Sequence, residues 1–318
     1  MASRFPVGAS MALDDDAIRV AVLAGIACDR TPGFSFTGHF QQLAWPVIGS
    51  DTVVVTMPAG PHHLDAHGEV DLTAQCVMLD AALATAPRLQ MEPGVRLATT
   101  HLHVQFTGHR AIGKLRVDAA FHGATREGGI GQLLAKAEVR SGADVVSHCN
   151  GVFVRLPPPA GNAPLAPLPW QQEKAPEMAP LLPQDLDDRE RAIFAACEGA
   201  LAARDDRRSF LQCFWGARAL PAANGARCEI AVGPHMANRV GHVQGGILMG
   251  IAGETAMAAV PRHTMLSNMS AWFIGAGQGP ALQCVSTVLH AGRSLAVVRT
   301  EITGHGGTRI LEAVSAHA

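Results

Sequence analysis

Apolar and polar residues fall into two long blocks along the chain, and both blocks have the same order of predicted elements. In the first block, residues 14–28 are predicted to form a helix, residues 36–48 and 52–57 extended segments, and residues 70–85 a second helix. Four further runs alternate in side-chain type and are bounded by glycine-containing turns, as strands are. These runs are residues 96–106, 111–122, 130–140 and 144–156.

The second block repeats that order. Residues 186–203 are predicted to form its leading helix, residues 210–220 and 226–233 its extended segments, and residues 245–259 its second helix. Its four strand-like runs are residues 264–275, 281–291, 294–304 and 309–318. Such self-similarity indicates an internal duplication.

The second helix of this block is apolar on nearly all sides. Residues 247–260 have the sequence ILMGIAGETAMAAV, and a helix without a polar face has to be covered on most sides. A strongly curved antiparallel sheet would cover it. The pattern therefore predicts an α+β fold of two tandem units, each with a curved antiparallel sheet wrapped round a long central helix.

A proline-rich segment separates the two blocks. Residues 157–183 contain nine prolines in 27 residues, and proline lacks the N–H that a helix or a central strand needs. We therefore expect an extended linker, and a surface loop within one domain is the alternative. The predicted division is an N-terminal domain at residues 1–156, a linker at 157–184 and a C-terminal domain at 185–318.

The composition is that of a compact protein and argues against several kinds of partner. Of the 318 residues, 48% are hydrophobic and 16% are charged, which gives ample material for a core. The formal net charge is -2 and there is no basic stripe, so nucleic acid is not an expected partner. No segment approaches the roughly 20 apolar residues of a membrane span, and the acidic start, with Asp14, Asp15 and Asp16, does not resemble a signal peptide.

The cysteines and histidines predict buried thiols in a reducing cytoplasm and no metal site. The seven cysteines are widely spaced and form no Cys-x-x-Cys pair, so neither a disulfide framework nor a zinc site is expected. One loop, with His62, His63, Asp65 and His67, has the composition of a metal site. Its spacing fits no helix or strand face, so ordinary loop polarity is the preferred interpretation.

A glycine-containing motif precedes the apolar helix of the second block. Its members are Asn238, Gly241, Gln244, Gly245 and Gly246, and Ser267 and Ser270 follow on the next predicted strand. This arrangement resembles the hotdog-fold acyl-CoA thioesterases of the phenylacetyl-CoA and 4-hydroxybenzoyl-CoA type. In that family the string is typically Asn-x-x-Gly-x-x-His-Gly-Gly, with an Asp or Glu nine residues after the His.

The resemblance covers both blocks and implies a function as well as a fold. It implies two sheet-and-helix units side by side, with a site for hydrolysis of acyl-CoA at the seam between them. No cofactor is implied, because coenzyme A enters as part of the substrate. Curved sheets of this kind commonly pair back to back, so we expect a homo-oligomer, a dimer of two-domain chains.

Each block carries only part of the family's site. Position 244 holds Gln in place of His, and nine residues later stands Gly253 in place of the acid. In the first block the equivalent string starts at Asp65 and lacks the paired glycines, but nine residues after Asp71 stands Asp80. One half therefore has the glycines without the acid, and the other half has the acid without the glycines.

Helix geometry favours a division of labour between the halves. Nine helical residues rise about 13 Å, so an acid at that distance cannot reach a carbonyl group at the start of its own helix. If the two central helices pack antiparallel across the seam, Asp80 lies near Gly245 and Gly246. Gly253 then lies near Leu72 and Thr73, and the sequence predicts one working site and one silent site.

The predicted catalytic residues are Asp80, Gln244, Gly245 and Gly246. Backbone N–H groups at a helix N-terminus stabilise the oxyanion of a thioester under attack, and glycine lets the carbonyl group approach them closely. Asp80 would act as general base on water or attack directly, and both roles stay open. Gln244 would orient a carbonyl group or water, and Glu254 is the alternative acid.

The predicted substrate-binding residues come from the motif, the next strand and nearby basic positions. They are Asn238, Gly241, Ser267, Ser270, Arg262 and Trp272. The nucleotide part of coenzyme A is expected outside the seam, near the basic residues Arg262 and Arg293. His103, Phe106 and Trp272 are compatible with a bulky or ring-containing acyl group and equally with ordinary core packing.

Two other functions stay open from the sequence. A hotdog hydratase or dehydratase would use His39 or His67 as its catalytic histidine. A non-catalytic acyl-CoA-binding protein would have lost turnover together with the residues that Gln244 and Gly253 replace.

Overall fold

The N-terminal half begins with helices and ends with four consecutive strands. The computed structural model describes residues 7–92, 94–125, 131–156, 165–172, 179–261 and 264–318. The first elements are α1 (Val7–Asp29), α2 (Phe36–Phe40), β1 (Ala44–Ile48), β2 (Thr52–Met57), the 3-10 turn η1 (Pro61–His63) and the central helix α3 (Leu72–Arg88). The four strands are β3 (Arg96–Phe106), β4 (Leu115–Ala124), β5 (Gln132–Ser141) and β6 (Asp144–Leu156).

The C-terminal half repeats this order, as the duplicated pattern predicts. Its first elements are α4 (Asp188–Ala203), α5 (Phe210–Phe214), β7 (Leu220–Ala222), β8 (Gly225–Ala231), η4 (Pro234–Met236) and the central helix α6 (Gly245–Ala258). Its last strands are β9 (Leu266–Phe273), β10 (Ala281–Ala291), β11 (Ala296–Thr303) and β12 (Arg309–His317). The 3-10 turns η2 (Pro169–Gln171) and η3 (Pro183–Asp185) lie between the halves, and η5 (His305–Gly307) precedes β12.

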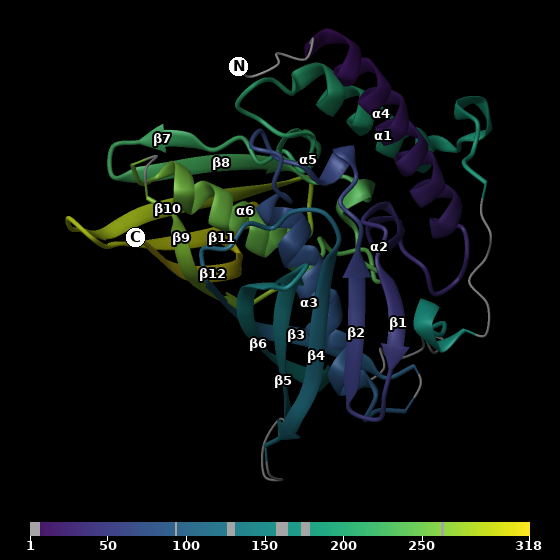
Figure 1. Ribbon diagram of the computed structural model, residues 1–318, viewed down its shortest axis with the longest axis horizontal. Coiled ribbons are helices and arrows are strands. Elements are labelled where there is room, and N and C mark those ends of the chain that lie inside the picture. The colour runs from purple at the N-terminus through teal and green to yellow at the C-terminus, as the bar shows by residue number, and fades with distance from the viewer. Residues whose placement is uncertain (1–6, 93, 126–130, 157–164, 173–178, 262–263) are drawn as a thin grey trace.

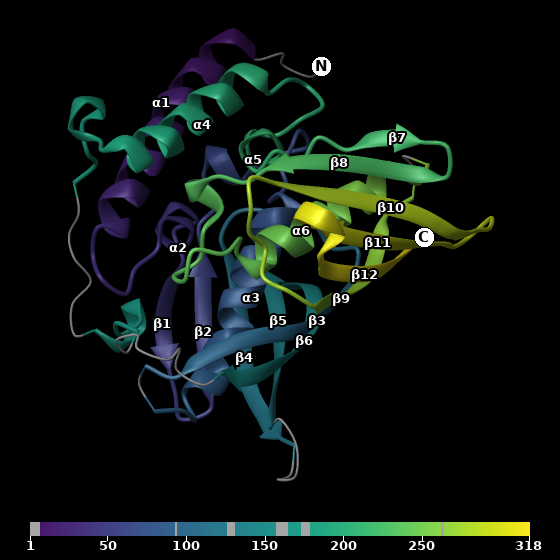
Figure 2. The same ribbon diagram turned by 180° about the vertical axis from the view of Figure 1, so that it is seen from behind.

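The strands of the described residues form one continuous antiparallel sheet. Their order is β1-β2-β4-β5-β6-β3-β9-β12-β11-β10-β8-β7. The two halves join where β3 pairs with β9, with His103 opposite Ser270. Figures 1 and 2 show the sheet curving round α3 and α6, which pack against each other at its centre. The predicted α+β fold of two curved antiparallel sheets, each round a central helix, is confirmed.

Two short helices, α2 and α5, stand where the alternating pattern predicts extended chain. Ser35 accepts a hydrogen bond from the Gly38 N–H at the start of α2. At α5, Ser209 accepts one from the Gln212 N–H, and the Gln212 side chain accepts one from the Ser209 N–H. These serine caps fix the start of a helix, and they outweigh the strand preference of the aromatic residues that follow them.

The two central helices pack antiparallel with their backbones in contact. A Cβ atom on Gly246 would lie 2.5 Å from the Cys76 carbonyl oxygen, and one on Gly250 would lie 2.5 Å from Thr73 Cα. As α6 advances, its neighbours on α3 therefore run backwards along that helix. Glycine permits this approach because it has no side chain. The antiparallel crossing that the sequence predicts, with Asp80 beside the start of α6, is present.

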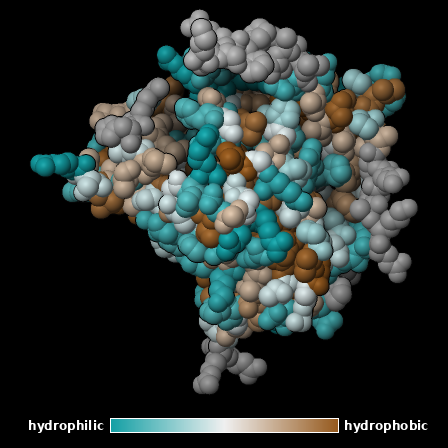
Figure 3. Space-filling view, in the orientation of Figure 1, coloured by the Kyte–Doolittle hydropathy of each residue, from teal (hydrophilic) through white to brown (hydrophobic). Residues whose placement is uncertain are grey.

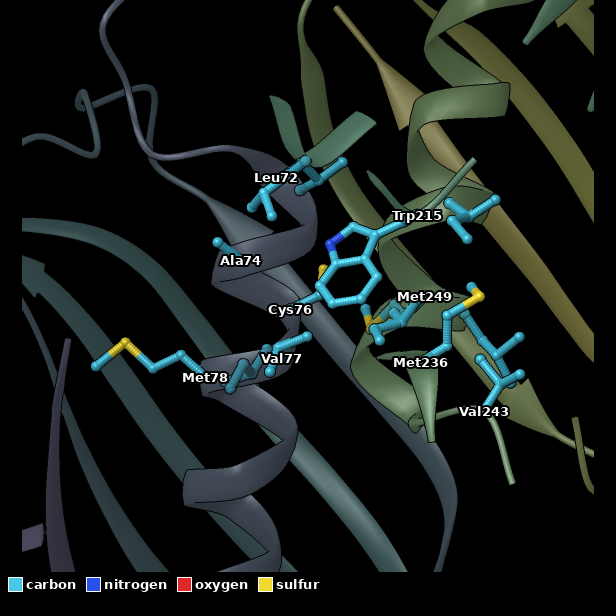
Figure 4. Close-up of a cluster of buried hydrophobic side chains, with 14 of the residues drawn as sticks. Leu72, Ala74, Cys76, Val77, Met78, Trp215, Met236, Val243 and Met249 are labelled. Atoms are coloured by element: carbon cyan, nitrogen blue, oxygen red, sulfur yellow. The ribbon is translucent and has the colours of Figure 1, made fainter. Parts of the chain in front are cut away.

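Apolar side chains from both halves fill the space round this crossing. Figure 4 shows Leu72 and Val77 of α3 facing Met249 of α6, with the Trp215 indole from the chain after α5 beside them. Trp215 and Met249 are fully buried, and one hydrophobic cluster spans both halves. Because the core is shared, it gives no independent division of the chain, and the predicted boundaries at residues 156 and 185 stay predictions.

A second contact between the halves lies outside the sheet. Helices α1 and α4 pack side by side, as both ribbon views show (Figures 1 and 2). Arg19 pairs with Glu198 at 2.7 Å, and Arg30 pairs with Glu190 at 2.7 Å. These ion pairs are partly exposed, so each adds at most about 1 kcal/mol to the stability of the packed helices.

The surface and the cysteines agree with the composition. On the face drawn in Figure 3, apolar residues lie in small patches among polar ones. Among the helices that the structure describes, none is long and apolar enough to cross a bilayer. The seven cysteines are free thiols and six of them are buried, as the sequence predicts.

The contact between α3 and α6 is testable by adding one methyl group. We expect Gly250→Ala to lower the free energy of unfolding by about 1–3 kcal/mol, because the new Cβ overlaps the α3 backbone. The measurement is thermal or urea unfolding followed by circular dichroism. Gly199→Ala is the matched control: Gly199 is an exposed residue of α4 and a Cβ there meets no atom within 4 Å. That control should be neutral or slightly stabilising, and equal stability of the two variants would contradict the close crossing.

Candidate active site

Asp80 is a buried carboxylate on an otherwise apolar stretch of α3. It lies in the sequence VMLDAAL, and 8% of its surface is exposed. The Thr99 hydroxyl of β3 donates a hydrogen bond to Oδ1 at 2.9 Å, and the Gln244 amide donates one to Oδ2 at 2.7 Å. Each carboxylate oxygen therefore has a donor, as a buried charged group requires.

Gln244 connects the acid of one half to the helix start of the other. It is the N-cap residue of α6, where its Oε1 accepts a hydrogen bond from the Ile247 N–H at 2.9 Å. Its Nε2 atom is directed at Asp80. A side-chain amide carries a donor and an acceptor at the same time. One residue can thus cap the helix and orient the acid, and unlike His it does not titrate near neutral pH.

The paired glycines have different neighbours. A Cβ atom on Gly245 would lie 3.0 Å from Asp80 Oδ2 and 3.3 Å from the Phe273 ring, so glycine keeps this space open beside the carboxylate. Gly246 instead touches the α3 backbone at Cys76, and its N–H faces Asp80. Gly245 therefore borders the reaction space, whereas Gly246 sets the distance between the helices.

The loop before α6 is held by Asn238 and Gly241. The Asn238 Oδ1 atom accepts hydrogen bonds from the Val240 N–H at 3.0 Å and the His242 N–H at 3.1 Å. Gly241 has φ +82°, a conformation that glycine adopts without strain. Asn238 also lines the cavity described next, but Gly241 does not. Both residues shape the approach to α6, and only Asn238 is in a position to touch a substrate.

A cavity of about 600 Å³ opens beside Asp80 and Gly245. Its walls come from the loop before α2, from α3, from the first residues of β3, from the loop before α6 and from the end of β9. Leu165 and Trp170 of the segment between the halves also line it. Its volume is within the range of small-molecule sites, and it is built from both halves, as the predicted inter-domain site requires.

The surroundings of Asp80 act on its pKa in opposite directions. Burial raises the pKa of Asp80 above its usual value. The Thr99 hydroxyl, the positive charge of Arg88 and the Gly246 N–H oppose this shift, because each stabilises the ionised carboxylate. A carboxyl group with a raised pKa is a better general base once ionised, and such groups in cavities are typical of active sites.

The equivalent position on the other side of the crossing is occupied by packed side chains. A Cβ atom on Gly253 would lie 2.6 Å from the end of the Leu72 side chain, so an acid at this position would have to displace Leu72. Glu254 follows it and accepts a hydrogen bond from the Gln212 amide at 2.8 Å. Glu254 does not line the cavity beside Asp80. Its assignment as the alternative acid of that site is therefore wrong, because the helix turns it towards α5.

Burial and a neighbouring carboxylate keep Glu254 from ionising at neutral pH. Burial, reinforced by the negative charge of Asp71, raises the pKa of Glu254 to about 8, and the hydrogen bond from Gln212 opposes the shift. Asp71 itself is buried, caps α3 and accepts a hydrogen bond from the Ser209 hydroxyl at 2.8 Å. This cluster stabilises two helix starts and holds a carboxyl group in its neutral form.

Part of the C-terminal half matches a known family in sequence. Residues 234–318, which contain the loop before α6 and all that follows, match the family described as acyl-CoA thioesterase N-terminal domain. A comparison with curated proteins gives no match.

Solved structures place both halves of the chain in the double hotdog fold. The chain is similar to the tesB protein of Mycobacterium avium subspecies paratuberculosis, with 11% identity, a TM-score of 0.50, and coverage of 86% of this chain and 94% of that one. It is similar to the 12:0-ACP thioesterase of Umbellularia californica, with 10% identity, a TM-score of 0.51, and coverage of 84% and 94%. A protein with hotdog fold from Alicyclobacillus acidocaldarius gives 10% identity, a TM-score of 0.52, and coverage of 86% and 94%. At these identities the likeness shows the fold alone.

Three residues predicted to bind substrate lie away from the cavity. Ser270 and Trp272 are on the face of β9 opposite buried Met269 and Ala271, and Trp272 is 44% exposed. The Ser267 hydroxyl donates a hydrogen bond to the Ala316 carbonyl at 3.0 Å. None of the three lines the cavity. Their predicted role is corrected. Ser270 and Trp272 point away from the helices because successive side chains of a strand point to opposite faces, and the Ser267 hydroxyl is bonded within the sheet.

Among the described residues, those predicted to lie near the nucleotide or to shape the acyl pocket are not found at the cavity either. Arg262 lies outside the described residues. Arg293 is exposed in the turn between β10 and β11 and does not line the cavity. His103 forms a hydrogen bond with Ser270 at 2.8 Å on the outer face, and Phe106 packs against the core without reaching the cavity.

The histidine-rich loop before α3 has a structural role. His62 Nε2 is 2.9 Å from the Phe40 carbonyl oxygen, and His63 Nδ1 accepts a hydrogen bond from the Gly60 N–H at 2.9 Å. Burial lowers the pKa of both imidazoles, to about 4 for His62 and about 2 for His63, so both are neutral. In the part of the chain that the structure describes, no group of histidine, cysteine and acidic side chains is arranged to hold a metal.

Three residues of the site have no signal in the sequence pattern. Thr99 reaches Asp80 only because β3 passes beside α3. Arg88 and Arg239 line the cavity from the end of α3 and from the loop before α6. Arg239 occupies a variable position of the Asn-x-x-Gly string, and its place next to Asn238 is the one clue that could have indicated it.

The neutral state of Glu254 predicts a specific dependence of stability on pH. Its pKa is near 4.5 when the chain is unfolded and about 8 when it is folded. Between these values only the folded protein holds the proton, so the contribution of this residue to stability falls as pH rises from about 4.5 to about 8. Glu254→Gln cannot ionise. We therefore expect the variant to match the wild type near pH 5 and to have the higher melting temperature at pH 8.

A matched substitution separates this effect from the loss of a surface charge. Glu229 is exposed on β8, and Glu229→Gln should leave the pH dependence of the melting temperature unchanged. A Glu254→Gln profile parallel to that of the wild type from pH 5 to pH 8 would contradict the neutral buried carboxyl group.

Proposed function

We propose that this protein hydrolyses an acyl-CoA thioester at a single site between its two halves. The observation that carries the proposal is the contact between Asp80 of α3 and the start of α6, where Gln244 donates to the carboxylate at 2.7 Å. The match of residues 234–318 to the family described as acyl-CoA thioesterase N-terminal domain supports the choice of substrate. The cavity of about 600 Å³ beside this contact supplies room for the reacting end of the substrate.

The proposed reaction uses water and the buried carboxylate. Asp80 accepts a proton from water as the water oxygen attacks the thioester carbon, and the carbonyl oxygen becomes an oxyanion. The N–H of Gly245 and the positive end of the α6 dipole stabilise this oxyanion. When the carbon–sulfur bond breaks, the proton on Asp80 passes to the leaving thiolate. The products are the carboxylic acid and coenzyme A.

Gln244 and Thr99 are proposed to keep Asp80 in position. Their hydrogen bonds, at 2.7 and 2.9 Å, come from opposite sides of the carboxylate. Neither donor carries a charge. Both hold the geometry of the carboxylate, and the Thr99 hydroxyl also stabilises its ionised form. Direct attack by Asp80, with an anhydride intermediate, is the alternative step. Transfer of one ¹⁸O atom from labelled Asp80 to the acid product would identify that route.

The proposal also covers the cofactor, the cellular compartment and the oligomeric state. We propose no cofactor, with coenzyme A entering only as part of the substrate. The unbridged thiols support a reducing compartment such as the cytoplasm. A dimer of two-domain chains is proposed from the outer face of the sheet, where Trp272 is exposed.

A hydratase or dehydratase is the second candidate because His39 lines the same cavity. Burial lowers the pKa of His39, so its imidazole is neutral and able to accept a proton. His67 is exposed and does not line the cavity, so it supports neither candidate. Formation or consumption of an enoyl-CoA absorbance without thiol release would favour this second function.

Replacement of the proposed base is the direct test. We expect Asp80→Asn to lower kcat for thiol release from an acyl-CoA panel about 100-fold or more, because the amide cannot accept the proton from water. Glu254→Gln is the control, since Glu254 lies on the other side of the crossing, and it should keep most of the wild-type activity. Full activity of Asp80→Asn would overturn the proposed site. Binding of acyl-CoA by wild type without thiol release would favour the non-catalytic binding protein.

The hydrogen bond from Thr99 predicts a shift of the pH profile. The Thr99 hydroxyl stabilises the ionised form of Asp80 and so lowers the pKa of this carboxyl group. Thr99→Val removes the donor at nearly constant volume. The pKa of Asp80 then rises, and we expect the acid limb of kcat/KM to move to higher pH.

Thr100 provides a matched control for this profile. Its hydroxyl donates to the Val152 carbonyl at 2.9 Å and not to Asp80. Thr100→Val should therefore keep the acid limb of the wild type. An acid limb that moves equally in both variants would show that Thr99 has no specific effect on the base.

A further inference from the structure

The cavity beside Asp80 has an excess of positive charge. Its lining includes three arginines, Arg88, Arg96 and Arg239, and one carboxylate, Asp80, which gives a formal charge of +2. The rest of the wall is mostly apolar, with Leu168, leucines of both halves and tryptophans among its side chains. Because charges in low-dielectric surroundings need a counter-ion, this lining is suited to a ligand that carries negative charge.

Arg88 lies at the end of α3 with its guanidinium turned back along the helix. Its Nη1 atom donates to the Ala84 carbonyl oxygen at 3.1 Å. Burial and the charge of Arg239 lower the pKa of Arg88 to about 10, and Asp80 opposes the shift. Among the described residues, no carboxylate oxygen lies within 4.0 Å of its nitrogen atoms. Within the described ranges one helix carbonyl is therefore its hydrogen-bond partner, and further N–H donors stay available.

Arg239 faces the same region from the loop before α6. Its Nη2 atom donates to the Ala166 carbonyl oxygen of the segment between the halves. Glu92 borders a small adjoining cavity together with Arg88 and Arg239. Within the described ranges, its carboxylate forms no ion pair within 4.0 Å with either guanidinium. Two like charges thus converge from two elements, each hydrogen-bonded to a carbonyl group. Among the described residues neither forms an ion pair with a carboxylate, and Asp80 acts on Arg88 only at longer range.

The position of this pair along α3 limits which part of the substrate it can hold. Ala84, which the Arg88 guanidinium contacts, is four residues beyond Asp80, a rise of about 6 Å. The pantetheine arm separates the thioester sulfur from the first phosphate by a chain as long as about four extended residues, roughly 14 Å. Between Asp80 and Arg88 the wall of α3 is formed by Ala81, Ala84 and Thr85. The Thr85 hydroxyl is engaged with the Ala81 carbonyl oxygen and the Trp45 indole N–H, which leaves a largely apolar path that a few methylene groups fill.

We propose that Arg88 and Arg239 bind a carboxylate at the far end of the acyl group, so that the preferred substrates are CoA thioesters of dicarboxylic acids. The thioester carbon lies at Asp80 and Gly245, the methylene groups pack on Ala81 and Ala84, and the terminal carboxylate accepts hydrogen bonds from the two guanidiniums. Charge-assisted bonds of this kind are the strong ones. The inference rests on the proposed function for the position of the thioester.

The test compares acyl groups of equal length with and without the terminal carboxylate. The pairs are glutaryl-CoA with valeryl-CoA, adipyl-CoA with hexanoyl-CoA, and suberyl-CoA with octanoyl-CoA. We expect wild type to prefer one or more carboxylated members by about tenfold or more in kcat/KM, the effect of one hydrogen bond to a charged group. In Arg88→Met and Arg239→Met this ratio should fall towards one, and Arg88→Lys should retain part of it.

Two controls identify the group that the arginines hold. Arg116 is outside the cavity and pairs with Asp118 at 2.5 Å, so Arg116→Met should keep the wild-type ratio. The same acyl pairs on N-acetylcysteamine lack all phosphates of coenzyme A, and the preference for the carboxylate should persist on them. If Arg88→Met instead weakens both members of each CoA pair equally and leaves the N-acetylcysteamine thioesters unchanged, the arginines bind phosphate and the proposal is overturned. A wild type that does not prefer the carboxylated members overturns it as well.

A binding measurement separates this inference from the proposed hydrolysis. Calorimetry with a non-hydrolysable thioether of carboxyacyl-CoA, compared with its neutral analogue, should give the same preference in wild type and its loss in Arg88→Met. If this difference is observed but no thioester is cleaved, the carboxylate subsite stands and hydrolysis is disproved. If neutral thioesters are cleaved in an Asp80-dependent way and the thioethers bind equally, hydrolysis stands and the subsite is disproved.

Discussion

The backbone contact between α3 and α6 is the constraint on which the core and the site both depend. Gly246 rests against Cys76 of α3, and Asp80 lies one helical turn beyond that contact. The distance between the helices therefore sets the distance from the carboxylate to the N-cap residue Gln244. A side chain at the crossing would move the helix axes apart, and the 2.7 Å hydrogen bond to Asp80 does not tolerate such a displacement.

A duplicated fold forms this crossing with two similar sides, and side-chain size makes them different. The capping serines Ser35 and Ser209 start equivalent helices. Three residues after the first stands Gly38, which lines the cavity, and three residues after the second stands Gln212, which fills the equivalent space and bonds to Glu254. One side is thus open, and its carboxylate, Asp80, is placed to act as a general base. The other side is closed and its acid is neutral.

Periodicity was sufficient to predict the fold, whereas the site was only partly accessible from the sequence. The strand alternation and the apolar helices locate most elements. Only α2 and α5 differ, because the capping serines Ser35 and Ser209 start a helix where the alternation predicts extended chain. The position of Asp80 follows from applying the nine-residue spacing of the resembled thioesterase family to both repeats. Thr99 could not be found, since its role depends on the path of β3 past α3. Trp272 was placed wrongly because alternation shows that a strand has two faces but not which face meets the helices.

The electrostatics of Asp80 connect the proposed carboxylate subsite to the reaction. In the free protein, burial raises the pKa of Asp80, and the positive charge of Arg88 holds part of that rise back. A substrate carboxylate bound at Arg88 neutralises this charge, so the opposing effect is removed when the substrate is in place. Asp80 then becomes a stronger base next to the thioester. A neutral acyl group of the same length leaves Arg88 unpaired and gives no such change, so the subsite would favour its substrate in the chemical step as well as in binding.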